Sequence, residues 1–340
     1  MEDDICPVTN YYERILMPVS YSLMFLLGLT LNGALLWRVC APTRRRSSAV
    51  IYTTNLAVAD LLYVLSLPPL IISDAMGELW LFGNALCKGV RFLFFVNLHC
   101  SMGFLTCVSV HRFLGVCFPI AAVRLRCKTL ARLASGSVWV LATAELLPTL
   151  AFAHTGEIDN RTVCFEMTDP GQFRVYFPYG LFLGIVGFLI PFLVVISCYC
   201  SMVTVLYCRA ADRVSNARTA RMRNKSIYKV LVVCLMFVAC FVPYHIAQTV
   251  YLFVRVYLPA NCHLLNVSMI AFKVWKPLVS FNCCANPLFY FLGSGRQRDR
   301  LRTWVWRTAR VQPVVCLVDA GDTNSHSASL DRLRLGQHGF

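Results

Sequence analysis

The chain has 340 residues, of which 57% are hydrophobic and only 14% are charged. Soluble globular domains carry about 25% charged residues, so this composition excludes an ordinary soluble protein and favours a bundle of membrane-spanning helices. The net charge of +15 could indicate nucleic-acid binding. The positions of the basic residues, given below, indicate membrane topology instead, and no nucleic-acid partner is expected.

Apolar runs of roughly 20 residues, the length that crosses a bilayer as a helix, recur along the chain. The predicted spans are Met17–Trp37, Ala49–Ile72, Val90–Phe118, Leu133–Ala153, Tyr176–Tyr207, Val230–Val254 and Leu264–Leu292. No connecting segment is long enough for another domain, and no repeated block indicates an inverted-repeat transporter. The sequence therefore predicts an all-α membrane protein with a seven-transmembrane helix bundle over residues 17–292.

The segments on either side of the bundle differ in composition. Residues 1–16 form the predicted extracellular N-terminus, and because the start lacks a basic stretch, we expect the first span to act as the signal anchor. Over residues 293–310, arginines alternate with apolar residues, which predicts an amphipathic helix on the inner leaflet, with an unstructured basic tail as the alternative. Residues 311–340 lack apolar periodicity and are predicted to be a disordered cytoplasmic tail.

Lysine and arginine concentrate in alternate connecting segments. They follow the first, third, fifth and seventh spans, as in Arg44–Arg46 and Arg124–Lys128, whereas the other connections carry mostly aspartate and glutamate. Basic connections remain in the cytoplasm. The sequence therefore predicts a multi-pass plasma-membrane protein with its N-terminus outside the cell.

Predicted outer segments contain four of the chain's 17 cysteines, Cys6, Cys87, Cys164 and Cys262. An even number on the oxidising side indicates two disulfides, for which the sequence allows three pairings. Asn160-Arg-Thr162, also on the predicted outer side, is a glycosylation acceptor motif.

Three cations interrupt apolar stretches near the outer end of their helices: Arg91, Lys273 and Lys276. Lys276 lies about 24 Å above the end of the last span, Lys273 is one turn higher on the same face, and Arg91 has a comparable height on the third span. A buried cation is costly in a membrane, so these residues predict a pocket for an anion. Alternatively, they extend to the lipid headgroups or pair with Glu166 beside Cys164. Glu145, within the fourth span, has no partner that the sequence identifies.

Every span carries a distinctive motif. In order, they are Asn32; Asn55-Leu-Ala-Val-Ala-Asp60; His111-Arg-Phe113; Trp139; Pro191 with Tyr199; Cys240-Phe-Val-Pro243; and Asn286-Pro-Leu-Phe-Tyr290. Together they resemble the rhodopsin-like G-protein-coupled receptors over nearly the whole chain before the tail. His111 and Phe241 replace the acid and the tryptophan that are typical of that family, so an acidic partner that holds Arg112 at rest is in doubt.

The resemblance implies roles for residues in the bundle interior. Asp60, Asn97, Ser101, Asn282 and Asn286 match positions that hold a sodium ion in this family, with a water-filled polar network as the alternative. Residues for G-protein activation are Arg112, Tyr199, Phe241, Pro243 and Tyr290. The resemblance further implies a heterotrimeric G protein as partner, with arrestin and a kinase as further partners and no cofactor other than sodium.

Finer motifs resemble the metabotropic purinergic (nucleotide) receptors. They are Phe92-Leu-Phe-Phe-Val-Asn-Leu-His99, Thr155-Gly with Asn160-Arg-Thr-Val-Cys164, Pro178-Tyr-Gly180 and Ala271-Phe-Lys-Val-Trp-Lys-Pro277. The second outer loop is most similar to the UDP-preferring branch. The resemblance implies the disulfides Cys6–Cys262 and Cys87–Cys164. It also implies a ligand site of Arg91, Lys273 and Lys276 with Tyr21, Tyr63, Phe95, Glu166, Tyr244, His245, Gln248 and Tyr251.

Gln248 departs from this resemblance, because nucleotide receptors typically carry a lysine or arginine there. With one cation fewer, the site is expected to bind a ligand with fewer phosphates, to bind the nucleotide more weakly, or to bind a different anion. The expected function is a receptor for an extracellular nucleotide, with uridine diphosphate favoured, that activates a G protein of the phospholipase C and calcium class. A receptor for a dicarboxylate or an anionic lipid is the alternative, and an anion transporter is a weaker one. An enzyme is not expected, because the histidines and cysteines lack the spacing of a catalytic nucleophile and its base.

Overall fold

The computed structural model describes residues 13–40, 47–158, 160–211 and 217–293. Within them, seven helical spans are long and apolar enough to cross a membrane, which confirms the predicted bundle. They are Arg14–Cys40, Ser48–Ala75, Gly83–Cys117, Lys128–Phe152, Pro170–Cys208, Cys234–Tyr257 and Cys262–Leu288. The predicted amphipathic helix and tail after Gly293 lie outside the described residues, as does most of the predicted N-terminal segment.

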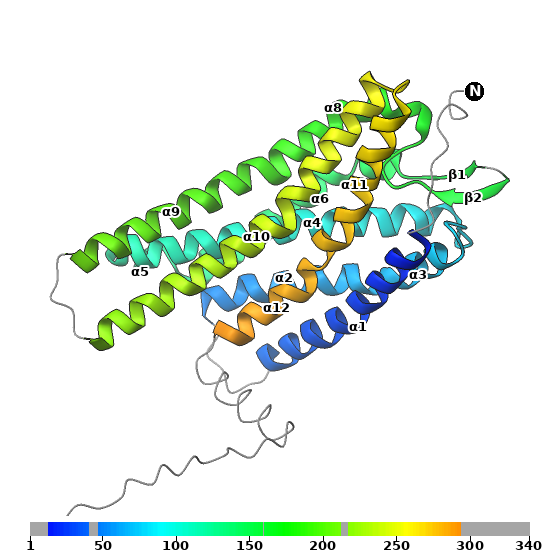
Figure 1. Ribbon diagram of the computed structural model, residues 1–340. Helices are drawn as coiled ribbons and strands as arrows, with labels where there is room; N and C mark the ends of the chain where they lie inside the picture. Colours follow the sequence, from blue (N-terminus) through cyan, green and yellow to red (C-terminus); the bar gives the residue numbers. More distant parts are fainter. Residues whose placement is uncertain (1–12, 41–46, 159, 212–216, 294–340) are drawn as a thin grey trace, which may run out of the picture. The chain divides into compact units, whose positions relative to one another are not determined.

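The helices run lengthwise beside one another, and α4 (Gly83–Cys117) has its most extensive contacts with three long neighbours (Figure 1). These neighbours are α2 (Ser48–Leu65), α6 (Lys128–Leu146) and α9 (Ile190–Ala211). The first helix, α1 (Glu13–Cys40), packs against α2 and α3 (Leu67–Ala75), and α10 (Ala217–Tyr257) packs against α11 (Cys262–Ser280). Since α4 contacts several helices, it can place residues from both of its ends into shared interiors.

Four predicted spans are interrupted in the structure. The second breaks at Ser66 between α2 and α3, where two prolines occupy the first turn of α3, a position that tolerates a missing N–H. The fourth breaks at residues 147–148, between α6 and α7 (Thr149–Phe152). The fifth contains a π-helical turn, η3 (Gly184–Leu189), between α8 (Phe173–Leu183) and α9. The seventh breaks at Phe281 between α11 and α12 (Asn282–Gly293). By contrast, α10 continues through Pro243.

Short elements lie between the long helices, either in the connections or at the end of a span. They are α5 (Pro119–Leu125), α7 (Thr149–Phe152), the 3-10 turn η2 (Pro170–Gln172) and a hairpin of β1 (Thr155–Ile158) and β2 (Arg161–Cys164). The strands pair antiparallel, Thr155 opposite Cys164. The turn between them contains Asn160, which is exposed and has a φ of 59°, a left-handed conformation that asparagine tolerates. Its glycosylation stays a prediction.

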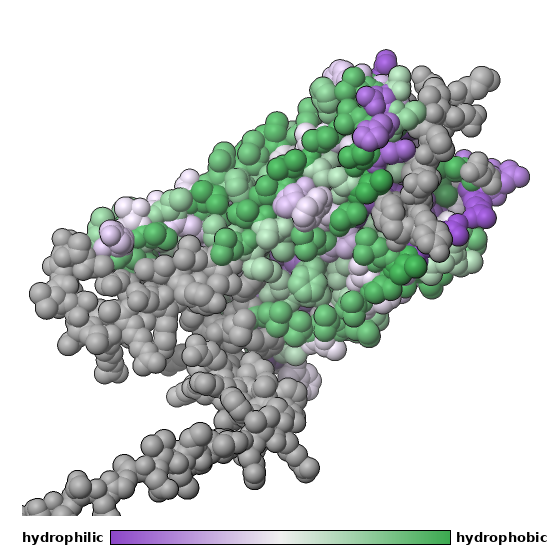
Figure 2. All heavy atoms as spheres, viewed as in Figure 1, coloured by the Kyte–Doolittle hydropathy of each residue, from purple (hydrophilic) through white to green (hydrophobic). Residues whose placement is uncertain are grey.

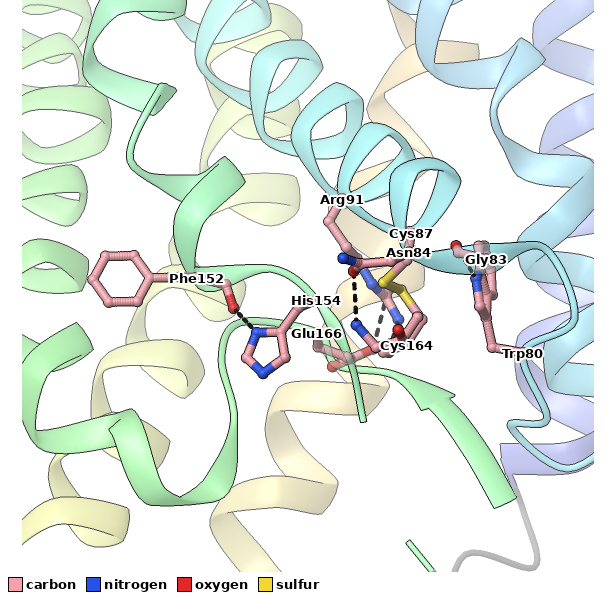
Figure 3. The surroundings of a disulfide bond; sticks show 10 residues. Trp80, Gly83, Asn84, Cys87, Arg91, Phe152, His154, Cys164 and Glu166 are labelled. Carbon is pink, nitrogen blue, oxygen red and sulfur yellow. Dashed lines mark hydrogen bonds and ion pairs between the residues drawn. A yellow bond between two sulfur atoms is a disulfide. The ribbon is translucent and has the colours of Figure 1, made fainter. Parts of the chain in front are cut away.

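A disulfide anchors the hairpin to the start of α4. Cys87 of α4 is bonded to Cys164 at the end of β2, which confirms one predicted pair (Figure 3). The Trp80 backbone N–H donates to the Thr162 carbonyl at 2.8 Å, and the Thr155 N–H donates to the Asn84 side chain at 3.1 Å. Cys262 is also in a disulfide, but its predicted partner Cys6 lies outside the described residues.

The surface is consistent with a bilayer around the sides of the bundle. Figure 2 shows apolar side chains along the helices and hydrophilic ones gathered at the end that carries β1 and β2. Exposed apolar residues include Trp37, Val140 and Leu141, which in water would be unfavourable. Inside, tyrosine and phenylalanine side chains from several helices form the core.

Candidate functional site

Two buried cations converge on one carboxylate at the disulfide end of the bundle. Lys276 of α11 donates a short hydrogen bond from Nζ to Oε1 of Glu166, which follows β2. Arg91 of α4 lies with Nη1 at 3.8 Å from the same oxygen, and its Nη2 donates to the Cys164 carbonyl at 2.8 Å (Figure 3). Arg91 is 9% exposed and Lys276 is 5% exposed. The predicted pairing of these cations with Glu166 is therefore present in the structure.

The two cations control the ionisation of Glu166. Burial alone raises the pKa of this carboxyl, but the positive charges of Lys276, Arg91 and Lys273 outweigh burial and lower the pKa to about 2. Glu166 is therefore ionised at neutral pH. We name Arg91, Glu166 and Lys276 together the ionic cluster.

Lys273 lies one turn from Lys276 but contacts a different acid. Its Nζ donates to Oε1 of Glu78 at 3.1 Å, in the loop after α3. Asp74, near the end of α3, interacts electrostatically with both Lys276 and Arg91. The three cations of the predicted pocket thus contact two carboxylates, Glu166 and Glu78, and Asp74 lies close enough to interact with two of them. In the sequence alone, Asp74 and Glu78 are distinguished only as acids of an outer connection.

Aromatic rings lie beneath the ionic cluster. The Lys276 ammonium is 5.5 Å from the centre of the Phe94 ring, and Phe94 contacts the rings of Tyr63, Phe95 and Tyr244. Tyr63 also donates from its hydroxyl to Ser280 Oγ at 2.9 Å. The structure thus brings together three of the predicted aromatic residues. Phe94, at their centre, was not predicted, although it adjoins Phe95 in the sequence.

The other predicted residues extend this region toward α10 and α1. Tyr251 stacks on Phe272, which also contacts Tyr244. Tyr21 of α1 is buried and interacts electrostatically with Glu166. Tyr21 on α1 and Tyr251 on α10 therefore both belong to the region around the ionic cluster and its aromatic rings.

His245 and Gln248 lie on the buried face of α10. His245 stacks on Phe188 of η3, with ring centres 4.2 Å apart, which places it beside the π-helical turn rather than the ionic cluster. Arg91 Nε, the Tyr244 hydroxyl and His245 Nε2 are buried and have no hydrogen-bond partner within the described part of the chain. Unpaired buried polar atoms are rare in proteins, and these three belong to predicted ligand-binding residues.

Glu145 has a partner that the sequence did not reveal. Its Oε1 lies 2.6 Å from Nδ1 of His99 on α4, and its backbone carbonyl accepts a hydrogen bond from the Tyr179 hydroxyl. Gly187 of η3 makes room for the histidine, since a Cβ at that position would overlap the His99 ring. The pair links α4 to α6 within the membrane-spanning part of the bundle.

The predicted sodium residues form a buried polar group. Asn97 donates to Asp60 Oδ1 at 2.8 Å, Ser101 to the same oxygen at 3.4 Å, and Asn286 to Oδ2 at 3.0 Å. Asn282 is buried at the start of α12 but makes no described hydrogen bond to Asp60. Asp60 thus accepts hydrogen bonds from two amide N–H groups and one hydroxyl in this state. The same side chains also carry hydroxyl and amide oxygens, the ligands that hard cations prefer, so their chemistry fits a sodium ion.

The predicted activation residues come from several helices, with Arg112 near the end of α4 that lies opposite the disulfide. The Tyr199 hydroxyl accepts a hydrogen bond from Ser109 at 3.0 Å, and Phe241 is fully buried against Phe237. Arg112 is partly buried and forms no ion pair with a described carboxylate. The neighbouring His111 accepts a hydrogen bond from Arg126 instead. The Tyr290 side chain lies outside the described residues.

Comparisons with known proteins agree with this arrangement. Residues 31–290 match the family model described as 7 transmembrane receptor (rhodopsin family). Purinoceptor 3 of Gallus gallus is 38% identical over 298 residues, covering 87% of this chain and 90% of the relative. Purinoceptor 6 of Rattus norvegicus is 41% identical over 288 residues, covering 84% and 87%. Purinoceptor 4 of the same species is 36% identical over 330 residues, covering 97% and 90%.

These matches confirm the predicted multi-pass membrane receptor and the prediction that the protein is not an enzyme. They extend over the helices that carry the ionic cluster, the Asp60 group and Arg112. The chain belongs to the purinoceptors of the rhodopsin family of seven-transmembrane receptors.

Proposed function

We propose that this receptor lies in the plasma membrane with its N-terminus outside, binds an extracellular nucleotide at the ionic cluster and activates a heterotrimeric G protein. The names of its relatives, purinoceptors 3, 4 and 6, support a nucleotide ligand. The basic connections at the Arg112 end support the orientation, because such segments remain in the cytoplasm. The ionic cluster then faces the outside of the cell.

The observation that carries this proposal is the convergence of Arg91 and Lys276, from two different helices, on the single carboxylate of Glu166. Phosphate oxygens form the same charge-assisted hydrogen bonds with arginine and lysine as a carboxylate does, and carry more negative charge. A diphosphate would replace Glu166 and engage both cations. Binding would therefore separate the loop after β2 from α11.

The surroundings fit the remainder of a nucleotide. The rings of Tyr63, Phe94 and Tyr244 offer stacking surfaces for a base. The unpaired Tyr244 hydroxyl and His245 Nε2 offer hydrogen bonds to a ribose or base. Buried polar atoms of this kind stabilise a ligand that supplies their partners.

Uridine diphosphate is the nucleotide we favour, because the second outer loop resembles the UDP-preferring branch. The neutral Gln248 leaves fewer cations for a third phosphate, which favours a diphosphate over a triphosphate. We assign coupling to the phospholipase C and calcium class on the same resemblance. Asp60, Asn97, Ser101 and Asn286 would hold a sodium ion, with Asn282 beside them.

The test is a dose–response of intracellular calcium and cAMP in cells that express the receptor. The panel contains uridine and adenosine mono-, di- and triphosphates together with succinate and lysophosphatidic acid. We expect uridine diphosphate to be the most potent and to raise calcium. A response to succinate or to the lipid without any response to nucleotides would refute the proposal.

Two variants connect the response to the ionic cluster. Arg91→Ala and Lys276→Ala should each weaken nucleotide potency by on the order of 100-fold, since each removes charge-assisted bonds to phosphate. Lys88→Ala is the matched control: it removes a cation one turn from Arg91 on α4 that forms no described ion pair. Surface expression is measured with an antibody. Unchanged potency in both cluster variants would show that the cations only anchor the helices.

A further inference from the structure

A cavity of about 550 Å³ lies at the end of the bundle opposite the ionic cluster. It is formed where the start of α2, the end of α4, α5 and the start of α6 meet. Its lining consists of Ser47, Ser48, Ala49, His111, Gly115, Pro119, Ala122, Arg126, Cys127 and Lys128. The volume lies within the range of about 300–1,000 Å³ that is usual for small-ligand sites. None of the roles assigned above uses this cavity.

The lining is positively charged. It contains Arg126 and Lys128 but no aspartate or glutamate. Neither cation forms an ion pair with a described carboxylate, unlike the three cations at the other end of the bundle. This charge is uncompensated within the described residues and favours an anionic ligand.

Arg126 is held in place by contacts from two helices. Its Nε donates to His111 Nε2 of α4 at 3.1 Å. Gly115, one turn further along α4, leaves room for the guanidinium, because a Cβ there would overlap Nη1. The Ser48 hydroxyl of α2 donates a short hydrogen bond to the Arg126 carbonyl. The guanidinium is thus positioned before any ligand arrives, which lowers the entropic cost of binding.

Two helices begin at the cavity. The 18-residue α2 starts at Ser48 and the 19-residue α6 starts at Lys128, so the N-terminal ends of both helices add positive potential beside the two cations. In α6, the Leu130 N–H already donates to Cys127 Sγ at 3.4 Å. The Ser47 side chain makes no capping hydrogen bond and leaves its hydroxyl available. Cations, hydroxyl groups and backbone N–H groups together form the donor set that phosphate groups require.

We propose that this cavity binds the phosphorylated headgroup of an inner-leaflet phosphoinositide. The proposal rests on the orientation given above, which places the cavity at the cytoplasmic side, where anionic lipids are enriched. Phosphomonoester groups contact Arg126 and Lys128. The exposed apolar side chains of Phe118, Ile120 and Leu125, on and next to α5, lie beside the acyl chains. A free inositol phosphate has the same headgroup chemistry but would make no use of these apolar residues.

Binding to the full-length receptor in phosphatidylcholine nanodiscs tests the proposal. The probes are dioctanoyl phosphatidylinositol 4,5-bisphosphate, inositol 1,4,5-trisphosphate, inorganic phosphate and dioctanoyl phosphatidylserine, each measured by native mass spectrometry. We expect the phosphoinositide to bind on the order of tenfold more tightly than the other three. Equal binding of inositol trisphosphate would overturn the lipid as the source of the phosphate, and equal binding of phosphatidylserine would overturn recognition of phosphomonoesters.

Variants connect this binding to the cavity. Arg126→Gln should weaken phosphoinositide binding on the order of tenfold. Arg132→Gln, which removes an exposed cation one turn along α6 outside the cavity, should change it less than twofold. Gly115→Ala keeps all charges but displaces the guanidinium, and should weaken binding as well. Equal losses in Arg126→Gln and Arg132→Gln would show attraction by surface charge alone and would overturn the site.

The assay contains no nucleotide, and both faces of a nanodisc are accessible. Its result is therefore independent of ligand binding at the ionic cluster and of the orientation in a cell. Retained nucleotide binding by each variant shows that the receptor has folded.

Discussion

Glu166 contacts two buried cations, Arg91 and Lys276, and its own ionisation depends on them. Its pKa of about 2 lies below the ordinary value of 4.5. A carboxyl with a lowered pKa stabilises the fold fully above its ordinary pKa, and this stabilisation is lost as the pH falls toward the lowered value. The contribution of Glu166 is therefore constant from neutral pH down to about 4.5.

This sign predicts how a neutral variant behaves. Glu166→Gln should lower the melting temperature of the purified receptor, and the difference from the unmodified protein should be the same at pH 7.4 and pH 5.5. The difference should shrink only below about pH 4.5, where Glu166 of the unfolded chain takes up a proton while the folded protein still holds it ionised. Thermal unfolding followed by tryptophan fluorescence measures both proteins. A difference that has already vanished at pH 5.5 would contradict the lowered pKa.

Gln248 allows a second test at the level of single residues. Gln248→Lys adds a cation on the buried face of α10 and should raise nucleotide potency about tenfold, most for the triphosphate. Gln248→Met, which keeps a similar length without the charge, is the control. Calcium dose–response curves provide the potencies. An equal gain in nucleotide potency in both variants would show that packing, not the added charge, causes the effect.

At the level of elements, the His99–Glu145 contact joins α4 to α6. His99→Phe and Glu145→Gln should each lower the melting temperature, because each leaves a buried polar group without its partner. The double variant should lose less than the sum, with a coupling of about 1–2 kcal/mol, the upper range for polar contacts within membranes. Losses that add up fully would show that the two residues act independently.

Apolar runs were sufficient to predict the helical spans, because a bilayer imposes both length and composition on each of them. The breaks at Ser66 and Phe281 were not predicted, although Pro68 and Pro277 lie close to them. A proline indicates a lost hydrogen bond, but packing decides whether the helix bends or ends. The π-helical turn at Gly184–Leu189 leaves no hydropathy signal.

The ionic cluster was predicted only in part, for a related reason. Lys273 and Lys276 lie on one helical face, so sequence spacing assigns them together. In the structure, they contact different acids, and Glu166 is 110 residues from Lys276. The path of the hairpin, set by the Cys87–Cys164 disulfide, decides which acid meets which lysine. His99 was likewise not identified as the partner of Glu145, because only the packing of α6 against α4 brings the two side chains together.

At the level of the whole molecule, the proposed function places ligand binding and G-protein activation at opposite ends of α4. Arg91 and Arg112 are separated by about 31 Å at the rise of an α-helix. Arg112→Ala should therefore leave nucleotide affinity within about threefold while abolishing G-protein activation, because the two sites communicate only through helix movement. Radiolabelled nucleotide binding and GTP exchange on purified G protein measure the two properties. Loss of nucleotide binding at normal expression would contradict this separation.

In the proposed function, the Lys276–Glu166 contact acts as an intramolecular competitor of the nucleotide. Glu166 is tethered beside the cations by the disulfide, so its effective concentration there is on the order of millimolar or higher. Every nucleotide has to compete with this intramolecular anion. The apparent affinity of the receptor for the nucleotide is therefore reduced in proportion to the fraction of receptors in which Glu166 contacts the cations. A monophosphate, with a single phosphate to exchange for the carboxylate, gains little from the competition, whereas a second phosphate gives a net advantage. Selection by phosphate number can therefore arise from an acid of the receptor as much as from its cations.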